Sequence, residues 1–251
     1  GGCGVKKEKA ADSELPEIII GMDYFEPYSY QASDGKYKGI DVELAKEAFQ
    51  RLGYQPKFEN IVWEDKDELL ADGTVDCLWS SYSMNGREDK YQWAGPYLYS
   101  RQMVVVKNES EIQTLSDLKG KRIAVQATTK AEDLFLHNIK SDLPQMQQVN
   151  CFSTTNEIYA ALRKSYVDAI AGHEAMLGSL VKEGKDAYRM LDESIYKSEL
   201  GVAFKKGTHE EVATDLTETL KKLQREGITE KIVTKYGLDA DEILPGGERN
   251  E

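Results

Sequence analysis

Hydroxyl side chains and a lone arginine stand close together in the segment V-D-C-L-W-S-S-Y-S-M-N-G-R at residues 75–87. The segment opens with an apolar run, Val75–Trp79, which has the length and composition of a buried strand. Ser81 and Ser83 follow this run, and Arg87 comes after a turn-forming Asn-Gly pair. Hydroxyl and backbone N–H groups are neutral donors, and a planar guanidinium binds a carboxylate in bidentate fashion. The segment therefore predicts a site for a small oxyanion. The alternative is a strand that runs into an exposed polar loop.

The composition excludes some classes of function. The chain has 251 residues, of which 40% are hydrophobic, and this suits two domains of modest size or one large domain. No apolar run approaches the roughly 20 residues of a membrane-spanning helix. The formal net charge of −12 argues against a nucleic-acid partner, because nucleic-acid binding needs clustered Lys and Arg.

The three cysteines are far apart and do not have the spacing of a zinc site or a disulfide framework. Cys77 and Cys151 lie beside apolar residues, so we expect both to be small buried side chains. Cys3 is followed by a polar, charged stretch and resembles the acylated cysteine of a bacterial lipoprotein; an incidental cysteine is the alternative. No signal peptide is present, so the protein is either cytoplasmic or begins after a removed one. Residues 1–16 are expected to form a flexible tether.

Apolar strands alternate with amphipathic helices along the chain, which predicts an α/β fold with largely parallel strands. Strands are expected over Ile18–Met22, Pro56–Val62, Val75–Trp79, Leu98–Lys107, Arg122–Gln126, Met146–Phe152, Val167–Ala171 and Leu200–Phe204. Helices are expected from Asp41 to Gly53, over Lys66–Ala71, from Thr129 to about Ile139, after a Thr154–Glu157 capping box, over Ala175–Lys182, and twice near the C-terminus. The α/β series occurs twice, which predicts two similar lobes.

Polar residues follow three of the expected strands, after Met22, Trp79 and Gln126. Ligands of open α/β sheets bind beyond the carboxyl ends of the strands. We therefore expect the three polar loops to contribute to one binding site.

Nearly the whole chain, from about residue 17 to 240, resembles the amino-acid-binding proteins of bacterial ABC uptake systems, the extracellular solute-binding protein family 3. The motifs that carry the resemblance, in chain order, are I-G-M-D at 20–23, K-G-I-D-V-E-L-A-K-E at 38–47, V-D-C-L-W-S-S-Y-S-M at 75–84 with Arg87, W-A-G-P-Y at 93–97, L-K-G-K-R-I-A-V at 118–125 with Thr129, V-D-A-I at 167–170 and G-V-A-F at 201–204. The motifs are more specific together than any one of them alone.

The resemblance implies a two-lobe periplasmic-binding-protein fold of type II. Each lobe would be a mixed, mostly parallel sheet flanked by helices, and two strands would form the hinge. Lobe 1 would comprise residues 17–102 and 202–251, and lobe 2 residues 106–199. The hinge crossings would lie at 103–105 and 200–201. A ligand that contacts the closed state more favourably would then close the lobes.

The resemblance also implies a function. The protein would capture an amino acid or a similar small zwitterion and deliver it to the permease and ATPase of an ABC importer. It would be a monomer without cofactor or metal, located at the cell surface or in the periplasm and anchored by a lipid on Cys3. One alternative is a periplasmic dehydratase-like enzyme with His173 or Glu174 as its acid/base group. Another is the sensor domain of a signalling receptor.

The resemblance assigns roles at the charged groups of the ligand. Arg87 would clamp the α-carboxylate. Ser81 and Ser83 would donate hydrogen bonds to the same carboxylate or offer backbone groups to the α-ammonium. The step from Ser83 to Arg87 is one residue shorter than the family often has. Asp23 would accept hydrogen bonds from the α-ammonium or orient the closing loop. A surface arginine, strand-end serines and a turn aspartate are the structural alternatives.

Four further residues are assigned to the rest of the ligand. Phe25 and Trp63 would enclose its aliphatic part, with Tyr24 as a rival for Phe25 because the loop is short. Thr129 would present the N-terminus of a helix to the carboxylate, and Gln126 would contact the ligand side chain. Core packing, helix capping and a strand-end position are the alternatives.

His173 stands where the family usually has an aspartate that neutralises the α-ammonium. A neutral imidazole does not match the charge of a carboxylate. Three explanations follow, in order of preference: Glu174 moves in, Asp23 holds the ammonium, or the ligand is not a standard α-amino acid. A loop histidine outside the site is the alternative. Gln126, Trp63 and His173 make a pocket without an obvious unpaired charge, which favours a neutral or polar ligand.

Overall fold

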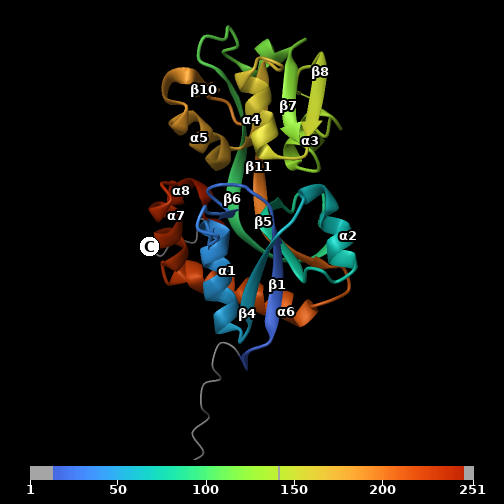
Figure 1. The fold of residues 1–251 in the computed structure, drawn as a ribbon, viewed down its shortest axis with the longest axis vertical. Coiled ribbons are helices and arrows are strands. Elements are labelled where there is room, and N and C mark those ends of the chain that lie inside the picture. Colours follow the sequence, from blue (N-terminus) through green and yellow to red (C-terminus); the bar gives the residue numbers. More distant parts are fainter. Residues whose placement is uncertain (1–13, 141, 246–251) are drawn as a thin grey trace, which may run out of the picture.

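The computed structural model describes residues 14–140 and 142–245, so the predicted lipid attachment at Cys3 lies outside the described residues. The ribbon forms two α/β bodies, one above the other, which we call the lower and the upper body (Figure 1). None of the described helices is both long enough and apolar enough to cross a membrane.

The lower body is built on three neighbouring parallel strands, in the order β4, β1, β5. Its strands are β1 (Glu17–Met22), β4 (Gln55–Asn60) and β5 (Cys77–Ser83), beside a small hairpin of β2 (Tyr30–Gln31) and β3 (Tyr37–Lys38). Its helices are α1 (Ile40–Arg51), α2 (Lys66–Ala71), α6 (Glu210–Arg225), α7 (Ile228–Lys235) and α8 (Ala240–Ile243). The C-terminal helices thus return to the body in which the chain begins.

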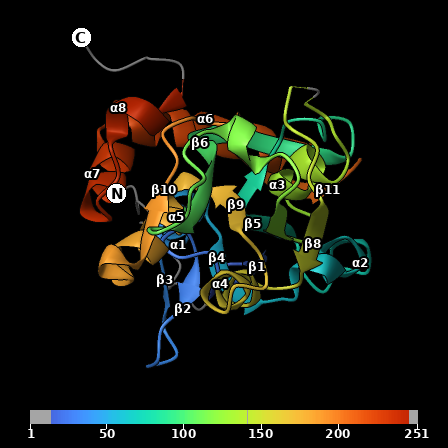
Figure 2. The same cartoon turned by 90° about the horizontal axis from the view of Figure 1, so that it is seen from above.

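The upper body repeats this arrangement with three parallel strands in the order β8, β7, β9. Its elements are β7 (Arg122–Gln126), α3 (Lys130–Phe135), β8 (Gln148–Phe152), α4 (Thr155–Arg163), β9 (Ala169–His173), α5 (Glu174–Glu183) and β10 (Tyr188–Met190). Seen from above, α3 and β8 lie on the same side as α2, whereas α5 and β10 lie on the side of α7 and α8 (Figure 2).

Two long antiparallel strands, β6 (Tyr91–Lys107) and β11 (Tyr196–Lys205), connect the bodies. They join the two sets of parallel strands into one sheet, with β11 next to β5 and β6 next to β9. The predicted α/β class with mostly parallel strands is therefore confirmed. The antiparallel pairs of this large sheet are those made by the two connecting strands, and the β2–β3 hairpin is a separate antiparallel pair.

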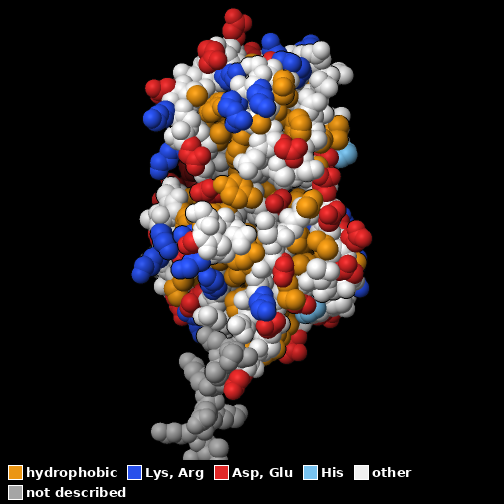
Figure 3. Space-filling view, in the orientation of Figure 1, with side chains coloured by type: hydrophobic (Ala, Val, Ile, Leu, Met, Phe, Trp, Pro, Cys, Tyr) orange, Lys and Arg blue, Asp and Glu red, His pale blue; other side chains and the backbone are white. Residues whose placement is uncertain are grey.

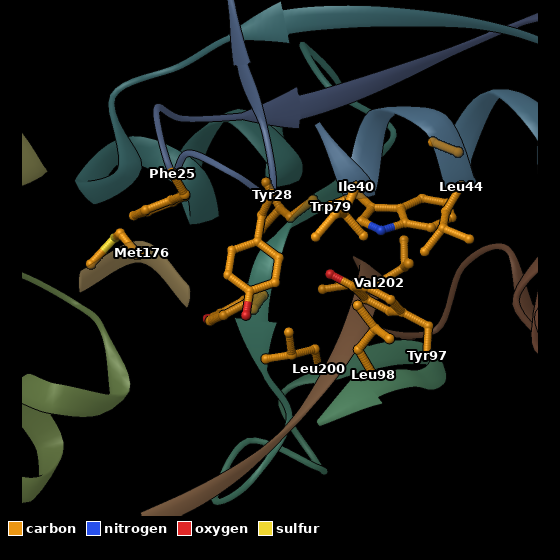
Figure 4. Close-up of a cluster of buried hydrophobic side chains, with 14 of the residues drawn as sticks. Phe25, Tyr28, Ile40, Leu44, Trp79, Tyr97, Leu98, Met176, Leu200 and Val202 are labelled. Carbon is orange, nitrogen blue, oxygen red and sulfur yellow. The ribbon is translucent and has the colours of Figure 1, made fainter. Parts of the chain in front are cut away.

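Apolar packing also links the two bodies. Met176 of α5 belongs to the same buried cluster as Phe25 and Tyr28, which follow β1 (Figure 4). Trp79 and Tyr97 continue this cluster inside the lower body, with their rings 5.6 Å apart. Charged side chains of both signs are interspersed on the surface drawn in Figure 3.

Gly39 fixes the loop after β1 against helix α1. It has a φ of 120°, and a Cβ at this position would lie 2.3 Å from the carbonyl oxygen of Tyr28. The close approach lets the Ile40 and Asp41 amides donate to the carbonyls of Pro27 and Tyr28, at 3.0 and 2.8 Å. The polar loop that carries Asp23 is therefore held by the start of α1.

Some predicted boundaries are wrong. The serines after Trp79 lie inside β5 and not after it, because the pairing with β11 continues to Ser83. Asp41 does not cap α1, since Gly39 occupies the N-cap and Asp41 lies in the first turn. The helix expected to reach Ile139 ends at Phe135.

Cys151 is exposed, which contradicts the expectation of a buried side chain, whereas Cys77 is buried as expected. The reason is position in the sheet. Cys151 lies on β8, which is an edge strand, whereas Cys77 lies on the interior strand β5. Both cysteines have apolar neighbours in the sequence, so these neighbours could not show which of the two is buried.

Candidate ligand-binding site

The predicted site residues come from the carboxyl ends of strands in both bodies. Asp23 follows β1 and Arg87 follows β5 in the lower body, and Gln126 ends β7 in the upper body. The Gln126 amide donates to the Asp23 carboxylate at 3.3 Å, and Arg87 pairs with Asp133 of α3 at 2.9 Å. The fold thus brings these residues together between the bodies, where parallel-stranded sheets place their ligands.

Arg87 is held in a fixed position. Its side chain is only 11% exposed, Nη1 donates to the Ser83 carbonyl at 2.9 Å, and Nη2 donates to Asp133 at 2.9 Å. Its Cζ lies 5.0 Å from the centre of the Tyr82 ring, within cation–π range. The guanidinium is therefore pre-organised at the interface of the two bodies, where a carboxylate of α3 already engages it.

Asp41 orients Ser81. Ser81 has a left-handed φ of 46°, and its N–H donates to the buried Asp41 carboxylate at 2.7 Å. Burial raises the pKa of the Asp41 carboxyl to about 7. Sequence reasoning took Asp41 for a helix cap and missed this role. The packing of α1 on β5 brings the Asp41 carboxylate next to Ser81, and the sequence gives no sign of this contact.

Several buried polar atoms near Arg87 and Gln126 have no hydrogen-bond partner among the described residues. They are Oγ of Ser81, Oγ of Ser83, Oε1 of Gln126 and Oγ1 of Thr128. An unsatisfied buried group costs free energy, so most such groups in folded proteins have a partner. Their grouping at strand ends of both bodies is suited to a small polar ligand.

Phe25 and Trp63 pack against each other edge to face, with ring centres 5.5 Å apart. They are 3% and 2% exposed. Tyr24, the rival for Phe25, is 37% exposed, and its hydroxyl donates to Glu26 at 2.6 Å. Of the two, Phe25 is therefore the residue that lies beside Trp63.

Thr129 supports Gln126 directly. The Thr129 hydroxyl donates to the Gln126 carbonyl at 2.7 Å, while the Gln126 amide also donates to the Ser153 carbonyl at 3.0 Å. Thr129 is the N-cap residue of α3, but its side chain makes no cap hydrogen bond. Its hydroxyl thus fixes the strand end that carries Gln126.

Asp23 has an unusual environment for a carboxylate. Burial raises its pKa to about 6, although hydrogen bonds from the Tyr24 amide and from Gln126 act in the opposite direction. A half-buried carboxylate without a cationic partner favours the approach of a cation. Asp23 is therefore suited to pair with an ammonium group.

His173 is buried and bound to the connecting strand β6. Its Nδ1 lies 2.7 Å from the Ser100 hydroxyl and 3.3 Å from the Gln102 amide nitrogen. Because an amide nitrogen only donates, we assign Nδ1 as an acceptor and place the ring proton on Nε2. Burial lowers the pKa of His173 to about 4, so the ring is neutral at pH 7. A neutral ring with Nδ1 occupied is a poor partner for an ammonium.

Glu174 is paired with Arg101 and not with Arg87. Its carboxylate forms a bidentate pair with Arg101, at 2.8 and 2.5 Å, and Arg101 also lies 3.7 Å from Glu242 of α8. These residues line a pocket of about 440 Å³ between α5 and the C-terminal helices. The movement of Glu174 toward the ligand, which was the preferred explanation for His173, thus requires breaking this pair.

Two buried lysines were missed. Lys66 and Lys130 begin α2 and α3, and each is 3% exposed. Lys130 donates to the Asn85 carbonyl across the two bodies, and burial lowers its pKa. Lys66 shares a buried helix face with Leu70, four positions later, and this spacing was the available signal. A site without an unpaired charge was expected, but Lys66 lies beside Trp63, one of the predicted site residues.

One group of side chains has the composition of a cation site. Glu132, Asp133 and His137 place ligand atoms within 4.8 Å of one another. Glu132 already accepts a hydrogen bond from the Thr128 amide, and Asp133 pairs with Arg87. These two partners would compete with a metal ion for the carboxylate oxygens of Glu132 and Asp133. The expectation that the protein holds no metal remains a prediction.

Two α/β bodies joined by two long strands, with polar side chains facing one another across the junction, define a two-body binding protein. The particular family follows from comparison with known proteins. The chain belongs to the bacterial extracellular solute-binding proteins, family 3, whose family model matches residues 18–239.

Curated relatives of this chain are named as amino-acid-binding proteins. The chain is 27% identical over 227 residues to the L-cystine-binding protein TcyJ of Escherichia coli K12, covering 89% of this chain and 83% of the relative. It is 25% identical over 254 residues to the glutamate-binding protein GluB of Corynebacterium efficiens, covering 93% of this chain and 83% of the relative.

Solved structures agree on the fold, which is that of type II periplasmic amino-acid-binding proteins. An ABC uptake transporter substrate-binding protein from Streptococcus pneumoniae with bound histidine superposes with a TM-score of 0.81 at 25% identity, covering 92% of this chain and 95% of that chain. An ancestral amino-acid-binding protein described as a precursor of cyclohexadienyl dehydratase has a TM-score of 0.78 at 24% identity and shows the fold alone, with coverage of 88% and 95%. These findings support a solute-binding receptor and do not favour the dehydratase alternative.

Proposed function

We propose that this protein captures an amino acid between its two bodies and delivers it unchanged to the permease and ATPase of an ABC importer. The observation that carries the proposal is the set of unpartnered buried polar atoms on Ser81, Ser83 and Gln126, next to the pre-organised Arg87. A zwitterion supplies acceptors and donors for such a set in one molecule.

The residues then have distinct roles. Arg87, Ser81 and Ser83 bind the α-carboxylate, which displaces Asp133 from the guanidinium. Asp23 accepts hydrogen bonds from the α-ammonium, as its raised pKa favours. Gln126, positioned by the Thr129 hydroxyl, contacts the ligand from the upper body.

We propose that binding closes a hinge. Lobe 1 comprises residues 17–102 and 202–251, and lobe 2 residues 106–199, with crossings at 103–105 and 200–201. The continuous strands β6 and β11 support this division, because no other strands run through both bodies in the described residues (Figure 1). Contacts such as Gln126 to Asp23 stabilise the closed arrangement.

The family is extracellular, and we propose that this chain works as a monomer at the cell surface or in the periplasm. A lipid on Cys3 would hold it at the membrane, with residues 1–16 as the tether. Labelling with radioactive palmitate tests the anchor; label that persists in Cys3→Ser contradicts it.

The function is tested by a thermal-shift screen of the full chain with the common amino acids, followed by calorimetry of those that stabilise. A true ligand at 100 times its Kd raises the Tm by about 5–10 °C. Chromatography after incubation should recover the ligand unchanged. Consumption of the ligand, or the absence of any stabilising amino acid, contradicts the proposal.

A further inference from the structure

Lys66 has an unusual environment for a lysine. It is the first residue of α2 and is 3% exposed. Its Nζ lies 5.3 Å from the centre of the Trp63 ring and 5.7 Å from that of Tyr82. Two aromatic faces therefore surround a buried ammonium group at the wall of the candidate site.

The described residues supply Lys66 with no hydrogen-bond acceptor and no ion-pair partner; its ammonium group contacts the two rings. Lys130 provides the contrast, since it donates to the Asn85 carbonyl and lies 3.5 Å from Asp133. The Lys66 side chain is largely removed from solvent, and cation–π contacts offset only part of the cost of desolvating an ammonium. Lys66 is thus the buried cation that is available to an anion.

Lys66 and Arg87 lie against the same aromatic ring. The Cζ of Arg87 lies 5.0 Å from the centre of Tyr82, and the Nζ of Lys66 lies 5.7 Å from it. The two positive charges repel each other, and Arg87 contributes to the lowered pKa of Lys66. One small molecule with two anionic groups satisfies both cations and removes this repulsion.

Charges of both signs act on Lys66: Asp67 and Glu132 raise its pKa, and Arg87 and Lys90 lower it, but both carboxylates already accept hydrogen bonds from other groups. Asp67 accepts hydrogen bonds from Tyr91 and Lys90, Glu132 accepts from the Thr128 amide, and Lys90 and Arg87 add positive charge. Burial is the largest influence and lowers the pKa of Lys66 to about 8, so the group is mainly protonated at pH 7. The tyrosine that faces it, Tyr82, is neutral there because burial raises its pKa to about 12.

We propose that Lys66 binds a second carboxylate of the ligand, so that the receptor is selective for amino acids that carry two carboxylates. This proposal rests on the proposed function, in which Arg87 binds the first carboxylate. Two kinds of molecule share the chemistry: an amino acid with an acidic side chain, and two amino acids linked by a disulfide. The inference replaces the sequence-based preference for a neutral or polar ligand.

Calorimetry with matched ligands tests it on the full chain. L-Glutamate and L-glutamine, and L-aspartate and L-asparagine, differ only by acid and amide, and L-cystine represents the linked pair. We expect wild type to bind one of the three dicarboxylates at least 10-fold more tightly than its amide or, for cystine, than the mixed disulfide of L-cysteine and cysteamine, which lacks only the second carboxylate. Lys66→Met should reduce that preference at least 10-fold and change the affinity for the neutral ligand less than threefold.

Lys57→Met is the matched control, because Lys57 is exposed and pairs with Glu17 on the surface. It should leave the preference unchanged. Equal weakening of acid and amide by Lys66→Met overturns the proposal, as does a wild type that binds a neutral or basic amino acid most tightly. If no amino acid binds wild type, the proposed function itself fails; a neutral ligand bound through Arg87 refutes the Lys66 inference alone.

A second measurement needs no variant. The affinity of wild type for the dicarboxylate should fall as pH rises through about 8, because the ammonium of Lys66 loses its proton there. The affinity for the amide should stay constant over the same range, apart from the titration of the ligand's own amine, which is common to both. Parallel pH profiles for acid and amide overturn the proposal.

Discussion

At the Arg87 end of the candidate site, Arg87 and Lys66 lie against one tyrosine ring, and Lys130 approaches from the upper body. At the end that holds His173, burial and the nearby charge of Arg87 keep the ring neutral, its Nδ1 is occupied by β6, and Glu174 is paired with Arg101. The first end is rich in cations, and the second has lost the acid that the family resemblance led us to expect.

The charge inside a binding site can therefore be opposite in sign to the net charge of the whole chain. The chain carries a net charge of −12, yet buried cations line its candidate site. Local desolvation makes these few charges matter more than the many exposed acids, which water and salt screen. Asp23 is the remaining acid of the predicted set that faces the upper body, through its contact with Gln126.

Arg87 should give the largest effect. Arg87→Met removes the charge that binds the α-carboxylate, so we expect affinity to fall at least about 100-fold, or roughly 3 kcal/mol. Calorimetry with the ligand found in the screen measures this loss. Arg51→Met, which removes an arginine paired with Glu226 on the surface, should have no effect on binding. A comparable loss in both variants contradicts the clamp.

Asp23→Asn should cause the second-largest loss of affinity. An amide cannot match the charge of the ammonium, so we expect a loss of about 10- to 100-fold for the amino acid. An analogue of the same ligand that lacks the α-ammonium should bind wild type and Asp23→Asn with equal affinity. In wild type, affinity should fall as pH drops below about 6, because the Asp23 carboxylate then becomes protonated. Equal losses for both ligands would show that Asp23 acts only on the structure.

His173→Asp should change affinity by up to about 10-fold, since it adds a negative charge on the ammonium side. We expect tighter binding of a neutral amino acid and a weaker preference for a second carboxylate. The titration compares L-glutamate with L-glutamine on this variant and on wild type. Unchanged affinities for both ligands would remove His173 from the site.

Glu174→Gln should have the smallest effect on binding, within about twofold, because the carboxylate faces the Arg101 pocket. Loss of the half-exposed ion pair should lower the free energy of unfolding by about 0.5–1 kcal/mol. Urea denaturation measures the second quantity. A loss of affinity as large as that of Asp23→Asn would place Glu174 at the ammonium after all.

Much of the fold was predictable because strands and helices leave short-range patterns. Helix α2 has the predicted bounds, Lys66–Ala71, and the capping box of Thr154 and Glu157 is present. Strand limits were less predictable, because the pairing of β5 with β11 extends the strand through serines that resemble a loop. The exposure of Cys151 likewise depends on its edge strand, which only the sheet order reveals.

The charges of the site depended on tertiary packing. The resemblance pointed to Arg87, Asp23 and Gln126, and the fold brings these residues together. It gave no signal for Lys66, whose burial follows from the packing of α2 against Trp63 and Tyr82. Nor did it foresee that Arg101 binds Glu174, since the two lie 73 positions apart.

A crystal structure with the ligand that stabilises the protein most would test the contrast between the two ends most directly. We predict that one carboxylate of the ligand lies within hydrogen-bond distance of the Arg87 guanidinium and that its ammonium lies against Asp23. A ligand bound instead in the pocket of Arg101 and Glu174, or one whose ammonium is held by His173 or Glu174, would contradict the account.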